Sequence, residues 1–177
     1  GARAGTLAIM AAGAPETYAA LEPVLKVIGN KLFHVGPKPG MAQIVKVANN
    51  ILSMTNTIIT SEAMVLGAKA GIDAQVMLDV INASSGRNRA TEDKFPAFVL
   101  PRNFKSARTA IVQKDVSLGL AEAERYGVPM WVAGAVLQFI NFAMTQGHAD
   151  KPSIGLVRII EEWAGAEVHG RESGETE

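Results

Sequence analysis

The chain has 177 residues, of which 48% are hydrophobic and 19% are charged, and its 17 Lys and Arg residues balance 17 Asp and Glu residues. This composition is typical of a globular protein with its own core, and without a basic excess it favours small molecules or proteins as partners over nucleic acid or an anionic membrane. The lack of cysteine excludes disulfides and thiolate metal sites, and the three histidines are isolated in sequence, so we expect no metal.

The first 36 residues predict a β-α-β unit. Residues 6–11 are an apolar run without helical period, Pro15 is suited to the first turn of a helix that ends near Ile28, and residues 31–35 read as a second strand. Such a piece is too small to bury both faces of a sheet, so we expect the rest of a sheet upstream.

One long helix is predicted from Met41 to Ala70, closed by Gly71. At 1.5 Å per residue it would extend roughly 45 Å, and apolar side chains surround it, so we expect it to be the buried axis of a bundle. The weakly charged stretch 48–61 carries Asn, Ser and Thr residues that a membrane span would have to bury, which favours a core helix.

The rest of the chain predicts shorter helices. Asp73 and Pro129 are helix-start signals, and Asp150 or Ser153 can cap the last helix. Pro96 and Pro101 should keep the segment that follows the loop at residues 84–88 short. The expected helices cover residues 73–83, 108–126, 129–146 and 150–163. The predicted fold is therefore mainly α: a β-α-β piece at 1–36, a bundle of about six helices around the long one at 37–165, and a polar, frayed tail at 166–177.

Lys46 and Asn50 are the clearest candidates for chemistry. They are four residues apart on the long helix and so share one face, which is otherwise apolar. Burial and the positive end of the helix dipole would both favour a neutral lysine amine, the form that accepts a proton. The alternative is that Lys46 extends to the surface with a packed stem, while Asn50 bonds to a neighbouring helix.

Three segments in order, GTLAIM, KVANN after a glycine-led turn, and QKDVSLGL, together resemble the β-hydroxyacid dehydrogenase family, in particular 3-hydroxyisobutyrate dehydrogenase-like enzymes. The resemblance covers residues 1 to about 164. It implies that Lys46 is the catalytic acid/base, that Asn50 contacts substrate and that Lys114 contacts the cofactor. The family usually has a glycine where this chain has Ala42, which puts the exact loop geometry in doubt.

The resemblance also implies an NAD or NADP cofactor and a small β-hydroxyacid substrate. The long apolar helices with little charge suggest a homo-oligomer, and because we see no signal or membrane segment we expect a cytoplasmic location. No G-x-G-x-x-G occurs, so we expect the phosphate-binding part of a Rossmann domain to lie upstream and this chain alone to be inactive. Arg87 is a candidate clamp for a substrate carboxylate or a solvated loop residue. The alternatives are a non-catalytic helical association module, or a related enzyme of 6-phosphogluconate, tartronate semialdehyde or imine reductase type.

Overall fold

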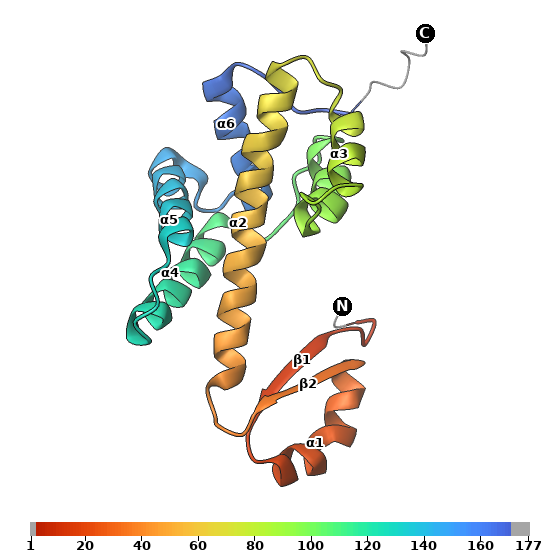
Figure 1. Ribbon diagram of the computed structural model, residues 1–177, viewed down its shortest axis with the longest axis vertical. Coiled ribbons are helices and arrows are strands. Elements are labelled where there is room, and N and C mark those ends of the chain that lie inside the picture. Colours follow the sequence, from red (N-terminus) through yellow and green to blue (C-terminus); the bar gives the residue numbers. More distant parts are fainter. Residues whose placement is uncertain (1–2, 171–177) are drawn as a thin grey trace. The chain divides into compact units, whose positions relative to one another are not determined.

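The computed structural model describes residues 3–170, and the chain divides into two compact units at the boundary between Asn49 and Asn50. The first unit holds strand β1 (Ala8–Ala12), helix α1 (Pro15–Ile28) and strand β2 (Lys31–Gly36). The strands pair in parallel, with Ala8 opposite Lys31, so the predicted β-α-β unit is confirmed (Figure 1). Helix α1 buries none of its residues, and its apolar Leu21, Val24 and Ile28 are 49–60% exposed, as expected for so small a sheet.

Helix α2 (Met41–Lys69) is the predicted long helix, and its middle and C-terminal turns carry the core of the second unit. Met54 and Ile58 pack into one apolar cluster, and Met64 and Val65 pack into another. Two sets of elements therefore pack against α2. Helix α3 and its neighbours contribute to the Met64 cluster, and α4 and α5 contribute to the Met54 cluster.

The expectation that α2 is buried all round was wrong. Leu52, Ile59 and Leu66 are 63%, 53% and 70% exposed, and because they recur every seven residues they form one apolar stripe. A helix with apolar residues on every side is buried all round only if enough other helices of the same chain pack against it, and the sequence of the helix does not show how many do. By length and mean hydropathy α2 could cross a membrane, but half of that apolar window is buried inside the chain, as in the core helix of a globular domain.

The other predicted helices of the second unit are present. Asp73 caps α3, because its carboxylate accepts a hydrogen bond from the backbone N–H of Val76 at 2.8 Å. The elements after α2 are α3 (Ala74–Asn82), the π-helix η1 (Ala90–Val99), α4 (Thr109–Arg125), α5 (Trp131–Ala143), the short π-helix η2 (Met144–His148), the 3₁₀ turn η3 (Ser153–Leu156) and α6 (Val157–Ala164).

Three details differ from the sequence prediction. The segment before Pro101 is not merely short, because η1 continues through Pro96 and buries Phe95 and Val99 completely. Neither Asp150 nor Ser153 caps α6, which follows directly from η3 without a side-chain cap. The expected frayed tail is packed up to residue 170, since Val168 is fully buried and Gly170 donates to the carbonyl of Leu100 at 2.9 Å. The rest of the tail lies outside the described residues.

Candidate functional site

Asn50 and Lys114, two of the predicted site residues, meet at one carboxylate. The amide Nδ2 of Asn50 on α2 donates to Oδ2 of Asp115 at 2.9 Å, and Nζ of Lys114 donates to Oδ1 of the same side chain at 2.7 Å. Asp115 lies on α4, so it links the two helices that carry the KVANN and QKDVSLGL segments. The sequence pointed to Lys114 but did not predict that its neighbour Asp115 binds Asn50.

The three side chains differ in their access to solvent. The Lys114 side chain is 62% exposed, whereas that of Asp115 is 28% exposed and Asn50 is half-buried. An exposed lysine–aspartate pair contributes little to stability. The carboxylate instead fixes the Asn50 amide, because it can only accept and therefore selects the NH₂ end. The amide oxygen of Asn50 is then directed away from Asp115, with its orientation set in advance.

Lys46 precedes Asn50 by one turn of α2 and is exposed in this chain, so the burial that we expected around it is not observed here. Lys46 belongs to the first compact unit, whereas Asn50, Lys114 and Asp115 belong to the second. The prediction that Lys46 shares a cleft with Lys114 therefore stays a prediction.

Arg87 lies in the loop after α3 and its side chain is 64% exposed. Its Nε lies 3.6 Å from Oε1 of Glu92, a long and exposed ion pair. The guanidinium is thus mostly solvated, and its role as a carboxylate clamp stays a prediction.

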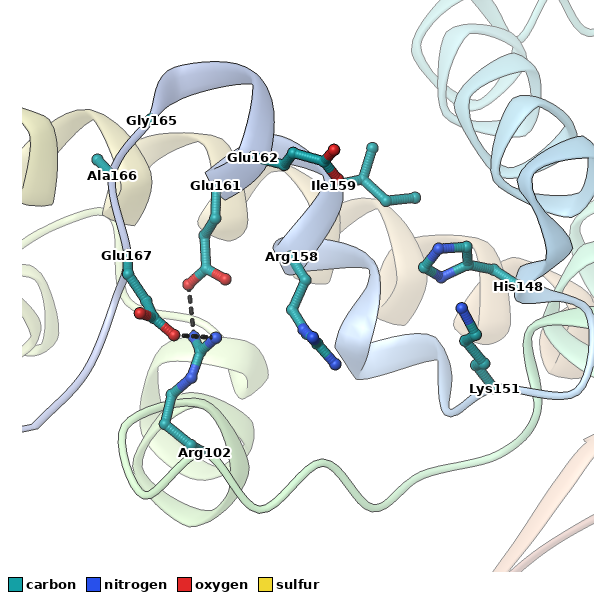
Figure 2. A pocket seen from close by; sticks show the side chains of 10 residues that line it. All are labelled: Arg102, His148, Lys151, Arg158, Ile159, Glu161, Glu162, Gly165, Ala166 and Glu167. Carbon is teal, nitrogen blue, oxygen red and sulfur yellow. Dashed lines mark hydrogen bonds and ion pairs between the residues drawn. The ribbon is translucent and has the colours of Figure 1, made fainter.

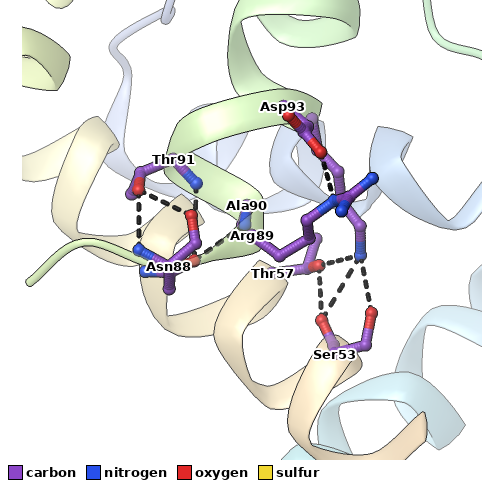
Figure 3. A network of polar contacts seen from close by, with 8 residues as sticks. Ser53, Thr57, Asn88, Arg89, Ala90, Thr91 and Asp93 are labelled. Atoms are coloured by element: carbon purple, nitrogen blue, oxygen red, sulfur yellow. Dashed lines mark hydrogen bonds and ion pairs between the residues drawn. The ribbon is translucent and has the colours of Figure 1, made fainter. Parts of the chain in front are cut away.

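A polar network on α2, beyond Asn50, was not predicted from the sequence (Figure 3). Lys94 of η1 donates from Nζ to Oγ1 of Thr57 at 2.7 Å and to Oγ of Ser53 at 3.1 Å. Burial lowers the pKa of Lys94, and the nearby positive charge of Arg89 lowers it further. Arg89 itself pairs with Asp93 one turn along the chain.

The C-terminal part of the second unit holds an open pocket of about 580 Å³ with charged walls (Figure 2). On one side Arg102 donates from Nη1 to the buried Glu161 carboxylate at 2.6 Å, and its Nη2 lies 2.5 Å from Oε1 of Glu167. On the other side lies His148, whose pKa is lowered by burial and by the positive charges of Lys151 and Arg158. Arg102 thereby ties residues 167–168 to Glu161 on α6.

Two family models match the chain. Residues 40–160 match the model described as NAD-binding of NADP-dependent 3-hydroxyisobutyrate dehydrogenase. Residues 1–36 match the model described as NAD binding domain of 6-phosphogluconate dehydrogenase. Together the two models cover most of the chain.

Curated relatives and solved structures agree with these models. The chain is 32% identical to 2-(hydroxymethyl)glutarate dehydrogenase of Eubacterium barkeri, over 96% of this chain and 56% of the relative. It is 37% identical to 3-hydroxyisobutyrate dehydrogenase of Pseudomonas aeruginosa, over 70% of this chain and 44% of the relative. A structure of Mycobacterium tuberculosis 3-hydroxyisobutyrate dehydrogenase with L-serine superposes with a TM-score of 0.81 at 28% identity, covering 90% of this chain and 56% of that one. The chain thus spans about half the length of the relatives that it matches.

Proposed function

The chain belongs to the β-hydroxyacid dehydrogenase family, and on this basis we propose that the protein oxidises a small β-hydroxyacid reversibly with NAD or NADP. The observation that carries the proposal is the contact chain from Asn50 through Asp115 to Lys114. It joins the two helical segments whose sequences resemble the family, and it brings the amide that we assign to the substrate close to the ammonium that we assign to the cofactor.

The proposed chemistry assigns one task to each side chain. A bound nicotinamide would accept the hydride from the hydroxyl-bearing carbon. Lys46 takes the hydroxyl proton while the carbon–oxygen bond becomes a carbonyl, and in the reverse direction it returns that proton. Asn50 uses its amide oxygen and its remaining N–H to orient the substrate, because Asp115 already holds the other end of the amide.

Lys114 fits a cofactor contact, since its ammonium is mostly exposed and only partly neutralised by Asp115. The 177 residues contain no glycine-rich phosphate loop of the G-x-G-x-x-G type. We therefore propose that this chain alone does not oxidise hydroxyacids and binds the dinucleotide only weakly, as an anion. The charges of Lys46 and Lys114 offset little of the entropy that is lost when a flexible dinucleotide is ordered. Calorimetric titration with NAD⁺ and NADP⁺ tests this, and a micromolar dissociation constant for either would contradict it.

The substrates and ligands of the relatives suggest a substrate class. 2-(Hydroxymethyl)glutarate, 3-hydroxyisobutyrate and L-serine all carry a hydroxymethyl group on the carbon next to a carboxylate. We propose the same reacting group for this protein. The complete protein should reduce NAD⁺ or NADP⁺ with at least one such compound and not with the α-hydroxyacid lactate. Failure with all three compounds and both cofactors would refute the proposal.

The association module remains a second candidate because specific observations favour it. Lys46 is exposed, Asn50 is paired within the chain, and Leu52, Ile59 and Leu66 expose an apolar stripe that suits self-association. The two candidates are separable, because a dehydrogenase that also oligomerises turns over hydroxyacids, whereas a pure association module does not. Light scattering measures the oligomer, and the activity assay above decides between them.

A further inference from the structure

Lys94 is a half-buried cation whose hydrogen-bond acceptors, among the described residues, are uncharged oxygen atoms. Its Nζ donates to Oγ1 of Thr57, to Oγ of Ser53 and, at 3.4 Å, to the backbone carbonyl of Ser53. Among residues 3–170 no carboxylate forms an ion pair with it. Its charged neighbour is Arg89, which has the same sign. A partly desolvated ammonium without a counter-ion is costly, and a bound anion would remove that cost.

A pocket of about 260 Å³ opens beside this ammonium. Thr57 and Lys94 line one part of it, Phe98 and Ile154 supply an apolar wall, and the exposed Lys105 adds a second ammonium. The hydroxyl of Ser106, which also lines the pocket, already accepts from the backbone N–H of Ile154. A carboxylate on a short hydrocarbon chain matches this combination of positive charge and apolar surface better than a polyhydroxylated group does.

The pocket lies along α2 from Asn50. Asn50, Ser53 and Thr57 are spaced i, i+3 and i+7, so they share one face of the helix. At 1.5 Å per residue, Ser53 and Thr57 lie about 4.5 and about 10.5 Å along the axis from Asn50. A ligand that contacts Asn50 at one end needs only a short carbon chain to bring its other end to Lys94.

We propose that the Lys94 pocket binds a second carboxylate of the substrate, so that the protein prefers dianionic β-hydroxyacids to monoanionic ones. This inference rests on the proposed dehydrogenase function and names the substrate class for it. Lys94 supplies the charge, Ser53 and Thr57 hold its ammonium in place, and Phe98 and Ile154 contact the carbon chain between the two carboxylates.

The test compares two substrates that differ only beyond the reacting group: 2-(hydroxymethyl)glutarate, with a second carboxylate, and 3-hydroxyisobutyrate, with a methyl group. The complete protein should show the higher kcat/KM for the dianion. Lys94→Met should lower that value by about tenfold or more, mainly through KM, and leave the value for the monoanion unchanged, because a charge-assisted contact is lost for one substrate alone. Lys94→Arg should retain most of the preference. Lys69→Met, at an exposed lysine in the last turn of α2, is the matched control and should change neither value.

Equal losses on both substrates, or no loss on either, would overturn the proposal. A binding arm separates its failure from failure of the dehydrogenase reading. Glutarate titrated into the 177-residue chain should shift the NMR resonance of the Lys94 side chain, and butyrate at the same concentrations should shift it much less. A glutarate-specific shift together with no turnover of any hydroxyacid would support the pocket and reject the dehydrogenase. Hydroxyacid turnover that is unaffected by Lys94→Met, without a glutarate-specific shift, would support the dehydrogenase and reject the pocket.

Discussion

Asp115→Ala is the substitution that tests the linkage between α2 and α4 most sharply. It removes the acceptor of Asn50 and of Lys114 at once. A hydrogen bond to a charged group contributes about 1.5–3 kcal/mol, and an exposed ion pair contributes about 0–1 kcal/mol. Because Asp115 is 28% exposed, the lower values apply, and the loss of unfolding free energy should be about 1–2 kcal/mol.

The assay is urea unfolding of the 177-residue chain. Asp115→Asn retains a carbonyl oxygen that accepts from Asn50, so it should lose less than Asp115→Ala. Asp150→Ala breaks a pair with Arg108 whose side chains are 83% and 61% exposed, and it should cost less than about 0.5 kcal/mol.

In the complete protein, Asp115→Ala should also lower kcat/KM about ten- to a hundredfold, because the Asn50 amide is free to turn away from the substrate. Asp115→Asn should restore most of that loss. If Asp115→Ala changed neither stability nor kcat/KM relative to Asp150→Ala, the carboxylate would have no part in positioning Asn50, and our account of the site would be refuted.

Three further outcomes are expected. Arg102→Met should destabilise the chain by about 3–5 kcal/mol in urea unfolding, because it leaves the Glu161 carboxylate, 6% exposed, without its cation; a loss no larger than that of an exposed ion pair would contradict this. His148 has a lowered pKa, so its stability contribution is present above pH 6.5 and is lost as the pH falls through the lowered value. His148→Gln should flatten the acid side of the stability–pH profile, and an unchanged profile would reject that reading. Lys114→Ala should raise KM for the cofactor most, and an effect confined to substrate KM would move Lys114 to the substrate pocket.

Much of the fold could be predicted because its signals are local. Pro15, Gly71 and Asp73 mark helix ends by the conformation and hydrogen bonds that their own backbones allow. Helix η1 could not be predicted in the same way. Its ten residues include Pro96, which local rules treat as a break, and the burial of Phe95 and Val99 against distant parts of the chain stabilises it instead.

The candidate site residues could be predicted from the sequence, but the contacts between them could not. Lys46, Asn50 and Lys114 lie in short segments that resemble a known family, so the amino-acid sequence alone points to them. The Asn50–Asp115 bond joins residues 65 positions apart, and Lys94 reaches Thr57 across 37 positions. Pairings of that range depend on how helices pack, and helical periodicity on one segment does not encode them.

We propose that Lys46 is the proton acceptor of a hydroxyacid dehydrogenase. Steady-state kinetics of Lys46→Ala in the complete protein, with a hydroxymethyl carboxylate as substrate, test it most directly. We predict a 10²–10⁴-fold lower kcat with near-normal folding and cofactor affinity, because the substitution removes a proton-transfer group and little else. Turnover close to that of the unmodified protein would show that Lys46 is an ordinary surface lysine and would contradict its role as the proton acceptor.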